Sequence, residues 1–192
     1  DTRLGSDEES ERAISVGKCR RVIDRMGPVE PFAWILHLHG DHRGDPPSAD
    51  MPRWLSRNRR SLAEMLDGGP APRTVCVETL DYDLELAAAL IEEFDLAVCV
   101  DIGHLLVNRR DVAQHLDRWW QRTRVLHVHG VTDSGKDHVH CGHLPPGLLE
   151  AIADRLCASP LRTRVMTMEV FGMVDFKRSV QAVAERLARW RK

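Results

Sequence analysis

The sequence lacks a strong charge of either sign and a long apolar run. Its 27 basic and 29 acidic side chains give a formal net charge of −2, so no global positive field is present to hold a nucleic-acid backbone. No apolar stretch approaches the roughly 18 residues needed to cross a bilayer, and no apolar segment with a cationic leader opens the chain. We therefore expect neither a membrane protein nor a secreted one, and nucleic acid is not an expected partner.

Closely paired cysteines are also lacking. The five cysteines are an odd number spread along the chain, at positions Cys19, Cys76, Cys99, Cys141 and Cys157. Two of them lie inside apolar, strand-like runs, where a thiol packs as a small apolar group. This pattern predicts reduced core thiols and a cytoplasmic protein instead of a disulfide framework.

Five short apolar runs are spaced along the chain, each bounded by turn residues. They are rich in Val, Ile, Leu and Met, as is typical of strands buried on both faces of a parallel sheet. The predicted strands are Ala33–His39, Thr74–Glu78, Leu96–Asp101, Arg124–His129 and Arg164–Glu169.

Helical patterns lie between these runs. A capping box formed by Ser6 and Glu9 predicts the start of a helix that Gly27 and Pro28 end. The other predicted helices are Trp54–Leu66, Leu84–Phe94, Asp111–Trp120, Gly147–Cys157 and Phe176–Trp190. Repeated alternation of strand and helix predicts an α/β fold with parallel strands, and the absence of a linker predicts one domain over residues 1–192.

Two architectures fit this alternation, an open doubly wound sheet and a closed (β/α)8 barrel. The chain has no Gly-x-Gly-x-x-Gly after the first strand and no Walker-type loop, so an open sheet would lack a phosphate-binding loop. A barrel usually needs about 250 residues, and a barrel interpretation places about three β/α units before the given chain. The distribution of polar residues, described next, favours the TIM-type barrel.

Histidines and carboxylates gather at the ends of the predicted strands. Three strands end on a carboxylate, and two end in His-x-His-Gly, at His37–Gly40 and His127–Gly130. Nine of the ten histidines lie at or just beyond a strand end; His115 is on a helix. Because parallel strands carry their carboxyl ends on one face, we expect these side chains to converge.

Several imidazoles next to several carboxylates are typical of a site for a first-row divalent metal. Without a cation, clustered buried carboxylates would repel one another and take up protons. A single strand-end carboxylate is more often a helix cap or an arginine partner, but that interpretation would have to apply to all five strands. We therefore predict one to three divalent ions, Zn or Mn.

The strand ends resemble those of the xylose-isomerase-like TIM barrels, which include endonuclease IV (AP endonuclease family 2) and sugar isomerases and epimerases. Val-Cys-Val-Glu78 is similar to the family's fifth-strand glutamate, and Asp101-Ile-Gly-His104 to its sixth-strand signature. The segment around His127 resembles the seventh strand and Met-Glu169 the eighth. His37, with His39 as the alternative, resembles the fourth-strand histidine. A narrower resemblance, carried by the segment at 37–42 and by residues 135–138, is to phosphodiesterases that remodel cobamides.

The resemblance implies a set of site residues. As metal ligands it implies His37, Glu78, Asp101, His104, His127, Asp137, His138 and Glu169. His140 is an alternative to His138, because the spacing after strand seven departs from that of the endonuclease branch. Glu78, Glu169 and Lys136 are the predicted catalytic residues, and His39, His129 and His140 the predicted substrate-binding residues.

Three functions fit these residues. The first is a metal-dependent phosphodiesterase that acts on a small phosphodiester, such as the nucleotide loop of a cobamide. The second is a sugar isomerase or epimerase that uses a single divalent metal, and the third is a metal-binding barrel without catalysis. The additional pair Asp137 and His138 favours the first. DNA is a less attractive substrate, because Arg57, Arg59 and Arg60 lie on a helix expected to face outward.

Overall fold

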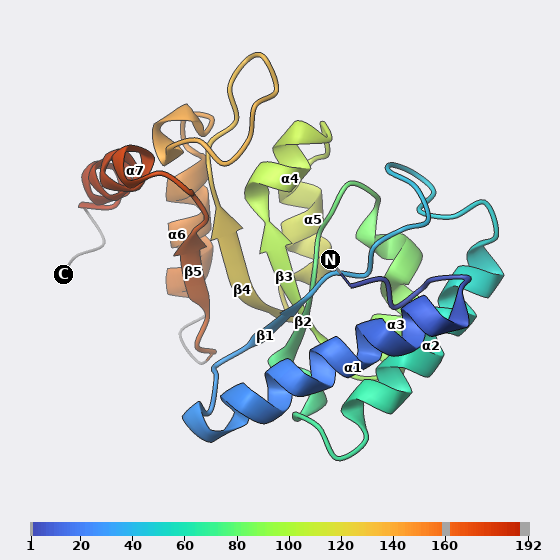
Figure 1. Cartoon of the computed structure of the whole chain (residues 1–192). Helices are drawn as coiled ribbons and strands as arrows, with labels where there is room; N and C mark the ends of the chain where they lie inside the picture. Colours follow the sequence, from blue (N-terminus) through green and yellow to red (C-terminus); the bar gives the residue numbers. More distant parts are fainter. Residues whose placement is uncertain (1, 159–161, 189–192) are drawn as a thin grey trace. The chain divides into compact units, whose positions relative to one another are not determined.

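The computed structural model describes residues 2–158 and 162–188, and the chain divides into two compact units. The first unit consists of residues 1–99 and 119–124, and the second of residues 100–118 and 125–192. Helices and parallel strands alternate along the chain in both units (Figure 1), which confirms the predicted α/β fold. None of the described helices is both long enough and apolar enough to cross a membrane.

In the first unit, parallel strands are joined by helices. Trp34 of the first strand lies opposite Val75 of the second, and Cys76 of the second lies opposite Ala97 of the third. The strands are β1 (Trp34–Leu36), β2 (Val75–Glu78) and β3 (Ala97–Asp101), whose last two residues belong to the second unit. The helices are α1 (Glu9–Met26), α2 (Met51–Leu66) and α3 (Ala88–Glu93), with the 3-10 turns η1 (Gly27–Val29), η2 (Pro72–Thr74) and η3 (Leu84–Ala87).

Local sequence explains how these helices begin and pack. The Asp50 side chain accepts the backbone N–H of Arg53 at 3.1 Å, and Pro52 occupies the first turn of α2, where its missing N–H costs nothing. Helices α1 and α2 lie side by side (Figure 1), with Trp54 and Leu62 of α2 fully buried.

In the second unit, strands β4 (Thr123–Val128), whose first two residues belong to the first unit, and β5 (Val165–Met168) are parallel, with Val125 opposite Val165. The helices are α4 (Ile102–Val107), α5 (Val112–Trp119), α6 (Leu148–Ala158) and α7 (Met173–Arg186), and η4 (Cys141–His143) is a 3-10 turn. Helix α7 packs on η4, where the fully buried Ser179 hydroxyl accepts the backbone N–H of Cys141 at 3.0 Å.

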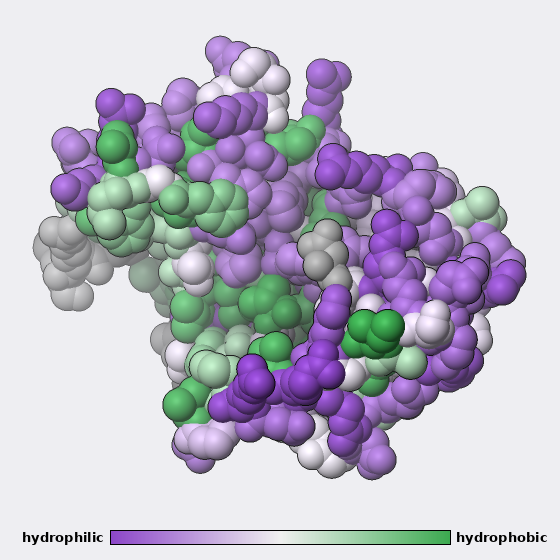
Figure 2. All heavy atoms as spheres, in the orientation of Figure 1, coloured by the Kyte–Doolittle hydropathy of each residue, from purple (hydrophilic) through white to green (hydrophobic). Residues whose placement is uncertain are grey.

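All five predicted strands are present, but burial on both faces is confirmed only for the inner ones. Every residue of β2 and of β3 is buried, whereas Ile35 of β1 is 38% exposed and Val165 of β5 is 39% exposed. Among the described residues, β1 and β5 each have a partner strand on one side only. On the face shown in Figure 2, apolar side chains also gather over α7, where Met173 and Val174 are exposed.

Several predicted helix boundaries are wrong. The Ser6 hydroxyl bonds the carboxylate of Glu11 at 2.5 Å and accepts the N–H of Glu8, so the expected capping box with Glu9 does not form. The predicted helix 84–94 begins as a 3-10 turn, and the short helix α4 was not expected as a separate element. Residues 189 and 190 of the last predicted helix lie outside the described part of the chain.

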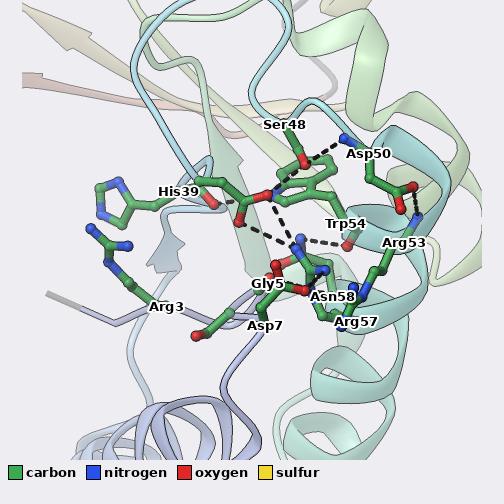
Figure 3. A network of polar contacts seen from close by, with 12 residues as sticks. Arg3, Gly5, Asp7, His39, Ser48, Asp50, Arg53, Trp54, Arg57 and Asn58 are labelled. Atoms are coloured by element: carbon green, nitrogen blue, oxygen red, sulfur yellow. Dashed lines mark hydrogen bonds and ion pairs between the residues drawn. The ribbon is translucent and has the colours of Figure 1, made fainter.

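The expectation that Arg57 faces outward is also wrong. Its side chain is buried, because Nε donates to the carbonyl of Gly5 at 2.5 Å and the guanidinium contacts the carboxylates of Asp7 and Asp41 (Figure 3). Arg59 pairs with Glu93, and Arg60 pairs with Glu9. All three arginines therefore have carboxylate partners.

Candidate metal-binding site

The carboxylate of Asp101 lies at the end of β3, where the strand turns into α4, and it is completely buried. Its Oδ1 caps the helix by accepting the backbone N–H of His104 at 2.9 Å, and it also lies 3.1 Å from Nε2 of His129. With Oδ1 engaged by these two groups, Oδ2 faces Nδ1 of His104 and Nδ1 of His127, each at 3.7 Å.

His127, at the end of β4, lies between two carboxylates. Its Nδ1 is 2.8 Å from Oε2 of Glu169, which follows β5, and 3.7 Å from Oδ2 of Asp101. Hydrogen bonding between β4 and the residue after β5 places Glu169 there, since its backbone N–H donates to the carbonyl of Val128 at 3.0 Å. Two carboxylate oxygens directed at one imidazole nitrogen form a set that a cation would stabilise, and oxygen and nitrogen donors of this kind suit Zn or Mn.

Three further histidines lie beside this set. One ring nitrogen each of His104, His129 and His138 falls within 4.8 Å of the other two. The rings of His129 and His138 are stacked, with centroids 4.0 Å apart, and Phe171 covers the other face of His138 at 4.7 Å. The structure therefore brings His138 to the group, whereas His140 faces His143 at 4.5 Å between ring centroids.

Charged neighbours shift the pKa values of the groups in this region. Burial alone would lower the pKa of His129, but the hydrogen bond to Asp101 and its charge outweigh burial and raise it. Burial would raise the pKa of Asp137, yet the hydrogen bond to His138 holds it below its usual range. The Oδ1 atom of Asp137 lies 3.3 Å from Nδ1 of His138, so these two predicted ligands are in contact with each other.

In the first unit, two predicted ligands meet. His37 follows β1 and its Nε2 lies 3.0 Å from Oε2 of Glu78, the buried last residue of β2. His39 lies against His37 with ring centroids 5.3 Å apart, and both line a cavity of about 340 Å³ with mostly apolar walls. Burial, followed by the charge of His37, lowers the pKa of His39, so its ring is neutral at neutral pH.

The remaining predicted catalytic residue, Lys136, is exposed at the end of a tight turn over residues 132–136. Its backbone carbonyl accepts the N–H of Thr132 at 2.9 Å, and its own N–H donates to the Thr132 hydroxyl at 3.1 Å. The turn is closed by Gly135, which has a φ of 82° in the region that favours glycine.

Sequence reasoning missed two residues of this region. Phe171 is 80% exposed and stacks on His138, and nothing in its sequence context signals this contact. Gly103 lies directly against the ring of His129: a Cβ at this position would come within 1.9 Å of the imidazole Cε1. A glycine in the first turn of a helix was the available signal, because glycine is a poor helix former unless space demands it.

Comparison with known proteins gives a consistent family and fold. The sequence model described as xylose isomerase-like TIM barrel matches residues 2–192. Among curated protein sequences, none matches this chain.

Several solved structures share the fold at low identity. The 3-keto-D-glucoside 4-epimerase of E. coli is 18% identical, with a TM-score of 0.67, over 100% of this chain and 75% of that one. A D-tagatose 3-epimerase-like protein is 18% identical with a TM-score of 0.74, over 98% and 74% of the two chains. Endonuclease IV of Thermus thermophilus is 18% identical with a TM-score of 0.69, over 98% and 73%. At this level of identity the similarity establishes the fold alone.

Proposed function

Because this chain belongs to the xylose isomerase-like TIM barrel family, we propose that it is a divalent-metal-dependent enzyme that hydrolyses a small phosphodiester. The arrangement around His127 is the observation that supports a metal site. The buried Asp101 and the carboxylate of Glu169 both face its Nδ1, at 3.7 Å and 2.8 Å, and a cation relieves the repulsion between the two acids. In this proposal Asp101, His127 and Glu169 are the first ligand set.

A second group of donors favours phosphodiester hydrolysis over a one-metal reaction. His104 and His138 lie next to the first set, with ring centroids 5.6 Å apart, and Asp137 contacts His138. Enzymes that displace an oxygen at phosphorus commonly use more than one ion. An isomerase with a single metal would need only the first set, so these additional donors would be superfluous for it.

Bound divalent metal would supply Lewis-acid chemistry, stabilising negative charge on the phosphoryl oxygens and activating water. The residues of this chain have separate parts in the reaction. Glu169, whose side chain is 30% exposed, reaches solvent and is the proposed acceptor of the proton of the attacking water. Lys136, exposed in its turn, is the proposed cationic donor to the phosphate. His37 and Glu78 are proposed as further ligands, with Glu78 also a proposed catalytic carboxylate.

A sugar epimerase is the second candidate. Two of the solved structures that share the fold are an epimerase and an epimerase-like protein, and a single ion held by Asp101, His127 and Glu169 could polarise a sugar carbonyl. The two candidates differ in what they need from Asp137 and His138, because those side chains lie outside the first ligand set.

A parallel assay of two substrate classes tests the proposal. Metal-free protein is reloaded with Zn or Mn and incubated with bis-p-nitrophenyl phosphate, with a cobamide, and with a panel of ketoses. The cobamide is included because of the narrower resemblance in the sequence. We expect metal-dependent release of the phenol or opening of the nucleotide loop, and no conversion of ketoses. Ketose conversion without phosphodiester cleavage would establish the second candidate instead.

Two variants sharpen this assay. Asp101→Asn keeps an oxygen that can cap α4 but removes the ligand charge, so it should abolish metal-dependent turnover of either substrate class. Asp137→Ala should lower phosphodiester cleavage by at least about tenfold, mainly in kcat, and Asp133→Ala in the same exposed turn should not. Equal activity of both turn variants would contradict the role of the second donor group.

A further inference from the structure

His129 is completely buried, and each of its ring nitrogens has a polar neighbour. Nε2 lies 3.1 Å from Oδ1 of Asp101, and Nδ1 lies 2.9 Å from the backbone nitrogen of His138. One imidazole thus connects the carboxylate at the end of β3 with the loop that follows β4.

The neighbours of the ring determine where its proton lies. A backbone N–H can only donate, so the 2.9 Å contact with His138 makes Nδ1 an acceptor. The carbonyl of Gly130 is farther from Nδ1, at 3.3 Å. The remaining nitrogen, Nε2, therefore carries the proton and faces Oδ1 of Asp101 at 3.1 Å.

Packing fixes the position of the ring as well. The face of His129 is covered by the stacked ring of His138, at a centroid distance of 4.0 Å. Three ring atoms of His129 lie so near Gly103 that a Cβ there would come within 1.9 to 2.3 Å of them. The Asp-Ile-Gly-His segment therefore needs glycine at position 103 to admit this imidazole.

We propose that His129 is a positioning residue of the metal site, in place of the substrate-binding role expected from the sequence. By donating to Oδ1 of Asp101, it leaves Oδ2 directed toward His127 and His104. By accepting the N–H of His138, it holds the loop that carries the second donor group. This inference rests on the proposed metal-dependent function, and it adds that the two ligand groups are coupled through one ring. Mutation of a residue that hydrogen-bonds a metal ligand typically lowers the metal affinity by about 10–100-fold.

The two functions of the ring can be separated by substitution. Asparagine at position 129 reaches the place of Nδ1, so it can accept the His138 N–H but cannot reach Asp101. Glutamine reaches the place of Nε2, so it can donate to Asp101 but leaves the His138 N–H without its acceptor. We expect His129→Asn to weaken the tighter-bound Zn about 10–100-fold with normal amide exchange at His138. We expect His129→Gln to keep the Zn affinity and to speed that exchange.

The experiment is a chelator-competition titration with Zn, together with amide hydrogen exchange on the same full-length samples. His115→Gln is the matched control, because His115 is a buried histidine of α5 whose Nδ1 contacts the backbone carbonyl of Asp111 at 2.9 Å. It should leave both readouts unchanged. Equal losses of affinity in the asparagine and glutamine variants, or none in either, would overturn the proposal.

A second measurement uses the unmodified protein and does not depend on how the variants fold. Nitrogen-15 NMR of the histidine rings at alkaline pH should show His129 with its proton on Nε2, and a proton on Nδ1 would overturn the proposal. Failure of the proposed function has a different outcome. If the parent protein binds no Zn, the metal-dependent function is contradicted, while the ring proton and the exchange at His138 still decide the hydrogen bonding of His129.

Discussion

Replacing Gly103 with alanine should destabilise the protein, although alanine is the better helix former. A Cβ at position 103 would lie 1.9 Å from Cε1 of His129, so the ring would have to move by about 1.5 Å to reach ordinary contact. Overpacking of this kind costs about 1–3 kcal/mol. Alanine in place of glycine in a helix contributes about 0.5–1 kcal/mol in the opposite direction. The expected net loss in free energy of unfolding is therefore about 1 kcal/mol, the middle of a range of about 0–2.5 kcal/mol.

The effect of Gly103→Ala on the free energy of unfolding should change sign when the His129 ring is removed. In a His129→Ala background the obstructing ring is gone, so Gly103→Ala should stabilise by about 0.5–1 kcal/mol. Gly17→Ala is the control, because a Cβ on that residue of α1 meets only Arg21 at 3.8 Å, and it should stabilise in either background. Urea unfolding in chelator of the six metal-free proteins, the parent and the His129→Ala variant each alone, with Gly103→Ala and with Gly17→Ala, measures all of these values. If Gly103→Ala has the same effect with and without the His129 ring, the packing argument is refuted.

Three further predictions concern charge and thiol chemistry. Asp101→Asn should remove most of the increase in Tm that Zn gives the parent protein, as measured by calorimetry with and without the ion; an equal increase in both would count against Asp101 as a ligand. The hydrogen bond from Arg12 holds the pKa of Glu9 at about 2, below its value in an unfolded chain. The stabilisation by the Glu9–Arg12 pair is therefore complete above about pH 4.5 and is lost as the pH falls toward 2. Glu9→Gln should flatten this part of the plot of stability against pH, and an unchanged slope would exclude the pair as the cause of the slope. Burial raises the pKa of the Cys19 thiol, so iodoacetamide should modify the exposed Cys157 first, and mass spectrometry showing the reverse order would contradict this.

The sequence predicted the alternation of strands and helices well because apolar runs and their bounding turns are local signals. Four of the five strands begin and end within one residue of their expected bounds, with Glu78 and Asp101 at the ends of β2 and β3 as expected. Strand β1 ends at Leu36, three residues before the expected end at His39. The convergence of Asp101, His127 and Glu169 was also predicted, since it follows from parallel strands whose carboxyl ends share one face.

What the sequence could not predict depends on contacts between distant residues. Arg57 is buried because its guanidinium contacts Asp7 and Asp41. These two carboxylates come from other segments of the chain, so the helical pattern around Arg57 does not reveal the contact. Likewise, the choice between His138 and His140 depends on how the loop after β4 folds back, where the backbone of His138 bonds His129. The proposed role of His129 rests on its burial, and a strand-end histidine has the same sequence signal whether it faces a substrate or a carboxylate.

Metal content of the parent protein beside that of Asp137→Ala, with single-turnover cleavage of a phosphodiester by the same samples, tests the central claim most directly. The proposed function predicts that the parent binds more than one divalent ion per chain. The variant should lose about one ion and cleave more slowly with little change in substrate binding, because the lost charge acts at the developing negative oxygen. A parent that binds no divalent metal, or a variant with unchanged metal content and unchanged cleavage, would contradict it.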